Sequence, residues 1–400
     1  MLRHIVRPGV PDMFMFKPKP AIMYTVTAFI LGLTILATMM ARDPSLERKP
    51  KREAEEEWRR LLQSEALGCS PNVADPYEWR LAGYGSNMNF LLLAWANAIL
   101  DGRNDLAVIA NTQLFFPRTS CLAASDGQET RSGWPCIFAQ MPHLCAFDSD
   151  QEWAEFTNPH ARRRFFNKLW PSEQEKASRR DGVKFLRSRI PFIEQSVDGS
   201  GMDTFGFLAM LYEHLNSHLQ PWFEADVEAI LAEPDITAVR TGKYVSMHIR
   251  RTDKAIEVQY TETKEYFTRA FDYLSTSPSG LNATEITGLW LSTDDDIVFD
   301  EVKSLTPQYF PGVKPEAVVF VTNRVPMRGS KRGTADAIAD RDTYEAVVLL
   351  RVELLMLAGA EAFSGTFSSN IGRIVALMRE TLGKPKESAL SSDTADWFPG

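Results

Sequence analysis

The chain has 400 residues, and its 44 Lys and Arg against 52 Asp and Glu give a formal net charge of −8. Residues 53–400 alone carry 35 basic and 49 acidic side chains, and this acidic balance argues against a general nucleic-acid-binding surface. The length allows two domains, and a hydrophobic content of 44% supplies enough apolar side chains for their cores.

Near the N-terminus, residues 21–40 form a run of twenty residues without a charge, AIMYTVTAFILGLTILATMM. At helical rise this length matches the hydrocarbon thickness of a bilayer, so we predict an uncleaved transmembrane helix at 21–41 behind a cytosolic tail at 1–20. A cleaved signal peptide is the alternative, but it would need a shorter apolar region and a small-residue cleavage site before Arg42. Residues 42–74 read as a charged, solvated stem.

The residues leave two orientations open for this anchor. Four Lys and Arg precede the span and seven follow it by Arg60, and this count favours a cytosolic large domain. The sequon Asn282-Ala283-Thr284 and four cysteines without metal-binding spacing are instead compatible with a lumen. The cysteines are Cys69, Cys121, Cys136 and Cys145.

The first globular stretch is predicted at 75–234. Gly83-Tyr84-Gly85 leads into an apolar helix at 88–100, and a turn and a strand at 106–110 follow. This order suggests a Rossmann-like unit whose glycine turn lets the backbone approach a ligand. A plain tight turn explains the glycine pair equally well.

The second globular stretch, 235–385, alternates strands with helices. An alternation of this kind predicts an α/β fold with a parallel sheet that has helices on both faces. The strands are expected at 244–249, 288–292, 317–322 and 362–364, and the helices at 265–274, 343–358 and 369–380. Residues 386–400 are expected to form a tail, loop-like from Ser388 onward.

Polar clusters follow three of these strands: HIRRTDK from His248, then Ser292 to Asp296, then Thr366 to Asn370. In parallel sheets ligands bind beyond the carboxyl ends of the strands. Paired arginines and a helix start with two serines suit an anionic, phosphorylated ligand. Each cluster alone has a plainer explanation, as surface salt bridges or helix caps, but their joint placement favours a binding site.

The stretches HIRRTDK, LSTDD and TFSSNIGRIV resemble three successive motifs of the α1,6-fucosyltransferases of glycosyltransferase family 23, which add core fucose to N-glycans. Gln220-Pro221-Trp222 and Gly83-Tyr84-Gly85 also match. The resemblance is specific over about residues 211–380 and thinner over residues 79–145. It implies two facing Rossmann-like domains, the glycosyltransferase B fold. The acceptor-side domain would be 75–234 and the GDP-fucose-binding domain 235–385, behind an N-terminal transmembrane helix.

The resemblance also implies donor-site residues. His248 and Arg250 match the residues that hold the guanosine and the β-phosphate, and Ser369 matches a phosphate-binding serine. Glu353 stands where the family has an aspartate that accepts from the guanine N1–H and 2-amino group. The other expected donor-site residues are Asp294, Asp295, Ser368, Gly83, Tyr84 and Gly85.

The catalytic residues implied by the resemblance are Glu257, Arg251, Lys254 and Asp253. Glu257 matches the proposed general base when one residue is deleted before it, and Glu262 and Glu265 are the competing candidates. Arginines at the β-phosphate stabilise the charge that develops on GDP, so no metal and no further cofactor are expected. The general base takes the proton of the acceptor hydroxyl on the opposite face of the sugar.

The family assignment implies a single-pass type II protein of the Golgi membrane with a lumenal catalytic domain, and core GlcNAc of N-glycans as acceptor. The chain departs from the family pattern: Gly365 and Gly372 replace the cysteines that flank TFSS, and no SH3 domain follows Glu380. Three alternatives are a fucosyltransferase for another glycan, a Golgi sulfotransferase, and a non-catalytic glycan-binding protein. Residues 83–87 lack the lysine of a sulfotransferase phosphate loop, and HIRRTDK keeps all its charges.

Overall fold

The computed structural model divides the chain into two compact units, Met1–Lys49 and Pro50–Gly400. The cytosolic tail and the anchor predicted at 21–41 fall in the first unit, which lies outside the described residues. Within the described part of the chain, no helix is long and apolar enough to cross a bilayer. The structure describes residues 56, 59–60, 62, 74–77, 84–100, 105–109, 136–139, 144–147, 203–251, 261–277, 280–295, 297–320 and 344–393.

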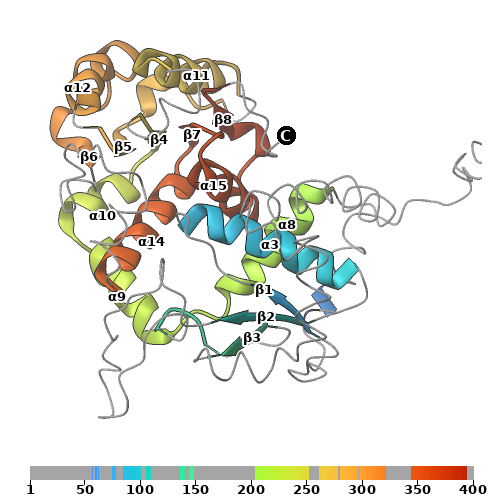
Figure 1. Ribbon diagram of the computed structural model, residues 1–400. Helices are drawn as coiled ribbons and strands as arrows, with labels where there is room; N and C mark the ends of the chain where they lie inside the picture. Colours follow the sequence, from blue (N-terminus) through green and yellow to red (C-terminus); the bar gives the residue numbers. More distant parts are fainter. Residues whose placement is uncertain are drawn as a thin grey trace, which may run out of the picture. The chain divides into compact units, whose positions relative to one another are not determined.

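The larger sheet has five parallel strands in the order β6-β5-β4-β7-β8. The chain starts at the central strand β4, moves outward through β5 and β6, and returns to the other side of β4 for β7 and β8 (Figure 1). The prediction of an α/β fold with a parallel sheet is confirmed. The strands are β4 (Tyr244–Ile249), β5 (Gly288–Thr293), β6 (Val318–Phe320), β7 (Ala362–Gly365) and β8 (Ala389–Ser391).

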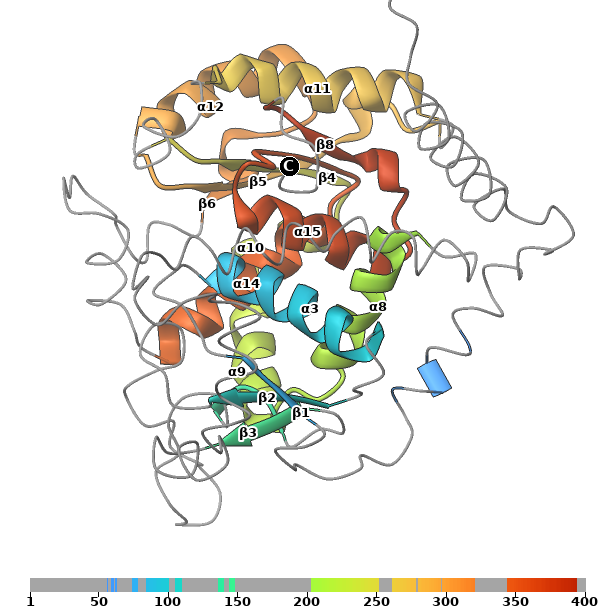
Figure 2. The ribbon, with the colours of Figure 1, turned by 45° about the vertical axis from the view of Figure 1, so that its right-hand side comes forward.

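Helices cover both faces of this sheet, as Figure 2 shows. On one face, Val245, Met247 and Ile249 pack with apolar side chains of α11 (Thr263–Thr276) and α12 (Ile297–Tyr309). Because successive strand residues point to opposite faces, the alternate residues of β4 face the other side. That side is covered by α14 (Tyr344–Gly359) and α15 (Asn370–Thr381).

The remaining described elements are not part of the five-stranded sheet or of the four helices that cover it. They are a parallel sheet in the order β1-β2-β3, four helices, and three short 3₁₀ helices. The strands are β1 (Ala74–Tyr77), β2 (Asp105–Ile109) and β3 (Leu144–Phe147). The helices are α3 (Tyr84–Leu100), α8 (Thr204–Asn216), α9 (Pro221–Leu231) and α10 (Pro234–Arg240), and the 3₁₀ helices are η3 (Ala283–Glu285), η4 (Pro315–Ala317) and η6 (Lys386–Ser388).

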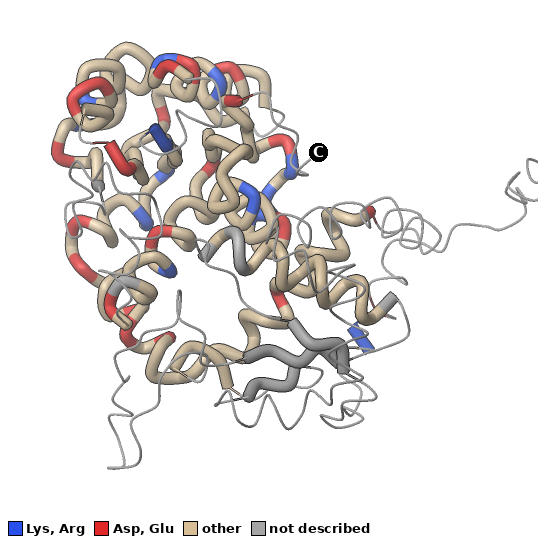
Figure 3. The backbone as a smooth tube through the Cα atoms, viewed as in Figure 1, with Lys and Arg blue, Asp and Glu red and all other residues tan. Residues whose placement is uncertain are grey.

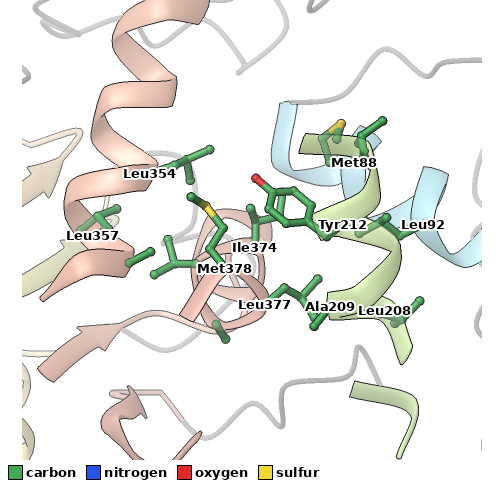
Figure 4. Close-up of a cluster of buried hydrophobic side chains, with 14 of the residues drawn as sticks. Met88, Leu92, Leu208, Ala209, Tyr212, Leu354, Leu357, Ile374, Leu377 and Met378 are labelled. Carbon is green, nitrogen blue, oxygen red and sulfur yellow. The ribbon is translucent and has the colours of Figure 1, made fainter. Parts of the chain in front are cut away.

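The helices α3 and α8 pack directly on α15 through one continuous apolar core. Figure 4 shows Met88 and Leu92 of α3 and Tyr212 of α8 close to Ile374 and Met378 of α15. The domain boundary predicted at 234/235 stays a prediction, but the apolar core does not stop there. The start of α15 is therefore supported from the first half of the chain as well as from the sheet.

Polar groups of β4 and α15 satisfy the carbonyls at the end of α14. Tyr244 Oη donates to Met356 O at 2.9 Å, and Ser246 Oγ donates to Leu357 O at 2.8 Å. The guanidinium of the buried Arg379 donates to the carbonyl oxygens of Ala358, Ala360 and Glu361. The last carbonyls of a helix have no partners within the helix, so these bonds fix the end of α14 and the strand β7 that follows it.

Two elements of the five-stranded sheet and its covering helices were not predicted from the sequence. Residues 389–391 were expected to be loop-like but form the edge strand β8. This strand pairs with β7, and Ala389 lies opposite Phe363. Three residues are too few for a periodic pattern to reveal. The helix α12 was not predicted either, and it contains Pro307, a residue that normally ends helices.

Candidate functional site

The candidate site lies where β4, β5 and β7 end. Since these strands are parallel, their carboxyl ends share one edge of the sheet, and the order in which strands are added reverses between β4 and β7. Ligands of open α/β sheets bind at this kind of switch point. At this edge the structure joins the three predicted polar clusters, because His248 contacts both Ser292 and Ser369.

His248, the residue before the last one of β4, is buried with 7% of its surface exposed. Its Nδ1 lies 3.0 Å from Ser292 Oγ on β5, and its Nε2 lies 3.3 Å from Ser369 Oγ at the start of α15. Burial, with a contribution from the nearby Arg250 charge, lowers the pKa of His248 to about 4. The imidazole is therefore neutral at physiological pH and joins the three strand ends.

Glu353 on α14 extends this connection, because Ser292 Oγ also donates to Glu353 Oε1. The residue is partly buried, and desolvation of its carboxyl raises the pKa of Glu353 to about 7, which the hydrogen bond from Ser292 only partly offsets. The structure thus places Glu353 at the predicted edge of the sheet. Its role in reading guanine stays a prediction.

Arg251 is held by a carboxylate that the sequence analysis did not identify. Its Nη1 and Nη2 donate to the two oxygens of Glu301 on α12 at 3.2 and 2.7 Å, and Nη2 also donates to Thr263 Oγ1. Only 7% of the Arg251 side chain is exposed. The buried guanidinium is thus paired with a partly exposed carboxylate, which is the plainer of the two explanations that the sequence left open for Arg251. The catalytic role of Arg251 stays a prediction.

Arg250 has different surroundings from its neighbour. Its side chain is 23% exposed, and its Nε lies 3.9 Å from Asp294 Oδ2. Asp294 Oδ1 accepts from the backbone N–H of Arg251 at 2.8 Å, so this carboxylate fixes the turn after β4. Of the two arginines, Arg250 is the one with more of its side chain accessible to an anionic ligand.

Asp295 begins the helix α12. Its Oδ1 accepts from the backbone N–H of Ile297 at 3.1 Å, which is the cap that the alternative explanation predicted. Its Oδ2 lies 3.9 Å from Arg251 Nη1. Asp295 therefore stabilises the helix that carries Glu301, and a direct role in donor binding stays a prediction.

The turn before α15 is held by Asp393, which the sequence analysis placed in the tail. Its carboxylate accepts from the backbone N–H groups of Phe367 and Ser368, both at 2.9 Å, and from Ser391 Oγ at 2.7 Å. Burial would raise the pKa of Asp393, but these hydrogen bonds outweigh it and the pKa lies below its usual value. The N–H of Ser368 is thus already bonded to a carboxylate.

Gly85 serves close packing at the start of α15. A Cβ at this position would lie 2.9 Å from the backbone C of Asn370 and from the backbone N of Ile371. Asn89, one turn further along α3, donates to Asn370 O at 3.1 Å. Gly83 lies outside the described residues, and the side chain of Tyr84 is not described. Contact of Gly83, Tyr84 and Gly85 with the donor therefore stays a prediction.

The predicted catalytic residues Asp253, Lys254 and Glu257 lie outside the described residues, and so their roles stay predictions. Within the described ranges, no three His, Cys, Asp or Glu side chains gather in a way that could hold a metal ion. Metal independence likewise stays a prediction.

Gln220 and Trp222, from another matched stretch, hold the segment 136–139. Gln220 Nε2 donates to Phe138 O at 3.1 Å, and Trp222 Nε1 donates to Cys136 O at 3.0 Å. Cys136 itself is disulfide-bonded. These residues have a structural role, away from the carboxyl ends of the large sheet.

Several residues of this edge lacked a signal in the sequence. Ser292 lies within a cluster that was recognised, but nothing indicated its bond to Glu353. Glu301 is one acidic residue among several on an amphipathic helix, and Asp393 follows a strand of three residues. Only the fold shows which of these carboxylates meets an arginine or a backbone amide.

Three comparisons relate the chain to known proteins. No family model matches the chain, and no curated protein matches it, but its structure is similar to solved structures of fucosyltransferases. NodZ α-1,6-fucosyltransferase soaked with GDP-fucose is 14% identical, with 76% of this chain and 91% of that chain covered and a TM-score of 0.44. NodZ from Bradyrhizobium also matches at 14% identity, with 76% and 92% covered and a TM-score of 0.43.

The other solved structures come from different fucosyltransferases. A mutant of Arabidopsis thaliana FUT1 in complex with GDP is 11% identical, with 83% of this chain and 74% of that chain covered and a TM-score of 0.40. POFUT1 in complex with GDP is 11% identical, with 79% and 98% covered and a TM-score of 0.37. At these TM-scores the similarity does not establish a function for this chain.

Proposed function

We propose that the chain is an inverting fucosyltransferase that transfers fucose from GDP-fucose to a glycan hydroxyl. The observation that carries the proposal is the convergence, at one switch point of a parallel sheet, of the accessible Arg250, the buried His248–Ser369 pair and the start of α15. The matched motifs HIRRTDK, LSTDD and TFSSNIGRIV supply the substrate class. Core GlcNAc of N-glycans, in α1,6 linkage, is the proposed acceptor.

The chemistry of the reaction suits these residue types. Breaking the bond between fucose and phosphate leaves negative charge on GDP, and the Arg250 guanidinium can bind phosphate oxygens without a metal. The first N–H groups of α15 and its partial positive charge add fixed donors at the same edge of the sheet. On the other face of the sugar, Glu257 is the proposed base for the acceptor hydroxyl.

We further propose a Golgi type II protein that is anchored through residues 21–41, with its catalytic domain in the lumen. Two observations support a lumenal domain. Asn282 of the sequon is exposed at the start of η3, where its side chain accepts from the N–H of Thr284 at 3.0 Å. The disulfide of Cys136 is typical of an oxidising compartment.

The proposal is tested by incubating the purified full-length chain with a panel of GDP-sugars, UDP-sugars and a sulfate donor, followed by a glycan acceptor array. We expect hydrolysis of GDP-fucose alone and transfer to biantennary N-glycans in the presence of a chelator. Transfer to a different glycan would retain the donor and replace the acceptor. Use of the sulfate donor, or GDP binding without any turnover, would instead identify a sulfotransferase or a non-catalytic glycan-binding protein.

A further inference from the structure

Four side chains from four elements form one continuous hydrogen-bonded chain at the candidate site. It runs from Ser369 at the start of α15 to His248 on β4, then to Ser292 on β5 and Glu353 on α14. The register of the sheet places His248 and Ser292 side by side, so both face α14. Among the described residues, every side-chain hydrogen bond of Ser369, His248 and Ser292 belongs to this chain.

The direction of one bond in this chain dictates the direction of the others. A hydroxyl has one proton to donate, and a neutral imidazole has one N–H and one acceptor nitrogen. An ionised Glu353 can only accept, so Ser292 donates to it and accepts from His248 Nδ1–H. His248 Nε2 is then an acceptor, and it takes the hydroxyl proton of Ser369.

A protonated Glu353 reverses the whole sequence. Its O–H donates to Ser292 Oγ, and Ser292 then donates to His248 Nδ1. The histidine carries its proton on Nε2 and donates to Ser369 Oγ. The hydroxyl proton of Ser369 is thereby released for another acceptor.

Burial makes intermediate arrangements costly. Ser369 has no exposed surface, and Ser292 and His248 expose 2% and 7%. A mixed arrangement would set two donors or two acceptors against each other at one of the three bonds, and such a contact is costly in a buried environment. The chain is therefore expected to reverse as a unit.

We propose that Glu353 and Ser292 are positioning residues whose proton arrangement sets the tautomer of His248 and the hydrogen-bonding role of Ser369 at the start of α15. The consequence for binding rests on the proposed function, in which the diphosphate of the donor binds at that helix start. An anionic ligand there favours the arrangement with the Ser369 proton released, and so it favours a protonated Glu353.

The pKa values of Glu353 and His248 fit this arrangement. Desolvation raises the pKa of Glu353 to about 7, so both of its forms are populated near neutral pH. Burial and the Arg250 charge lower the pKa of His248 to about 4, although the Asp294 charge opposes this, so the histidine stays neutral. A neutral histidine is needed, because only then does it have two tautomers.

Two titratable groups on the elements packed against α14 are bonded elsewhere. Tyr244 on β4 donates to Met356 O, and Asp226 on α9 accepts from Tyr344 at 2.7 Å. The remaining groups are Arg373 and Arg379 on α15, Glu224 and Glu228 on α9, and Glu345 and Arg351 on α14 itself. Desolvation and the Ser292 hydrogen bond are the causes of the Glu353 shift.

This role makes a prediction opposite to that of guanine recognition by Glu353. The guanine N1–H and 2-amino group are donors and require an ionised carboxylate. GDP affinity would then rise with pH. Release of the Ser369 proton requires a protonated Glu353, so here GDP affinity falls as the pH rises through about 7.

The proton arrangement can be tested without any ligand. We would label histidine with ¹⁵N in the full-length chain and follow the two ring nitrogens of His248 by NMR from pH 5 to 9. The wild type is expected to change from the Nε2–H to the Nδ1–H tautomer near pH 7. Glu353→Gln, which cannot ionise, should give one tautomer throughout, and so should Ser292→Ala.

The controls separate this coupling from a general loss of structure. Ser292→Thr keeps the hydroxyl and should restore the pH response that Ser292→Ala loses. Glu345→Gln removes an exposed carboxylate of the same helix and should respond like the wild type. The proposal is overturned by a wild-type tautomer that is constant over this pH range, or by a response that persists in Ser292→Ala.

A second measurement addresses the ligand. GDP is titrated at pH 6 and pH 8, and each affinity is divided by the value for Glu353→Gln to remove the ionisation of GDP itself. Wild-type affinity should be about five- to tenfold weaker at pH 8, because the protonated fraction of a carboxyl with a pKa of about 7 falls by about tenfold between these pH values. Affinity that rises with pH would overturn the Ser369 role. Absence of GDP binding at any pH would refute the proposed function and leave the tautomer test unaffected.

Discussion

Arg250 and Arg251 are adjacent in the sequence but belong to different faces of the sheet. Residue 251 continues the side of Met247 and Ile249, which faces α11 and α12, and there it meets Glu301. Residue 250 continues the side of His248. The two charges therefore do not share one surface, and the first is available to a ligand while the second stabilises the packing of α12.

This difference predicts opposite consequences of two matched substitutions. Arg251→Lys should lower the free energy of unfolding by about 1–3 kcal/mol, because a single ammonium cannot replace the fork on Glu301. Arg250→Lys should leave the denaturant midpoint unchanged and weaken GDP binding by about tenfold or more, the scale of a lost charge-assisted hydrogen bond. Equal stability of the two variants would show that Arg251 is not held by Glu301 in solution.

A third substitution addresses Asp393. Its hydrogen bonds lower its folded pKa, so they stabilise the protein above the unfolded pKa and are lost as the pH falls through the folded pKa. Asp393→Asn should cost about 1–2 kcal/mol at pH 7 in urea unfolding, and the difference from the wild type should shrink below about pH 4. The exposed Asp272→Asn on α11 is the control, and a difference that is independent of pH would contradict the assignment.

Glu257 is tested by its effect on turnover. Glu257→Gln should bind GDP with wild-type affinity, since the base is not needed for the phosphates, and should slow transfer by about a hundredfold or more, the usual scale for a general base. Glu262→Gln and Glu265→Gln are made in parallel. If one of these slows transfer and Glu257→Gln does not, the base is the other glutamate.

At the scale of elements, the start of α15 depends on helix α3, which comes from the opposite half of the chain. Gly85 lets the two helices approach, and Asn89 bonds to Asn370 O at their contact. The same helix start is held on its other side by β8 through Asp393. Helix α3 and Asp393 after β8 thus both determine where the turn at 366–369 lies.

We expect Gly85→Ala to displace α15 rather than to be absorbed. The added methyl group would meet backbone atoms at 2.9 Å, which cannot rotate away as a side chain could. Overpacking of this kind costs about 1–3 kcal/mol, and GDP binding should weaken along with stability. Asn89→Ala, which removes the hydrogen bond but adds no atoms, is the comparison. Unchanged melting of Gly85→Ala would mean that the helices separate easily at this point.

The sequence was most informative where the elements are long and regular. The strands near 244–249 and 288–292 were predicted closely, and so were three of the four flanking helices, α11, α14 and α15. Buried parallel strands and long helices have distinct patterns. The carboxyl ends of these strands then identified His248, Arg250 and Asp294. Partner choice was not predictable, since nothing local distinguishes Glu301 or Asp393 from other exposed-looking carboxylates.

For the whole molecule, the orientation of the large domain across the membrane can be tested. Figure 3 shows basic and acidic positions interspersed along the described backbone, including α11 and α12. In sealed microsomes the large domain should resist protease until detergent is added, and Asn282→Gln should remove one glycan and increase mobility on a gel. Digestion without detergent would place the domain in the cytosol and exclude transfer to lumenal glycans.

The strand order also has a consequence for how the protein folds. The central strand β4 pairs with β7, and Met247 and its partner Ser364 are separated by more than a hundred residues. Contacts between distant segments form slowly, because a long loop must close before they are gained. Until β7 arrives, one edge of the buried strand β4 is unpaired and can join other chains. We therefore expect slow refolding from denaturant, with yields that fall as protein concentration rises.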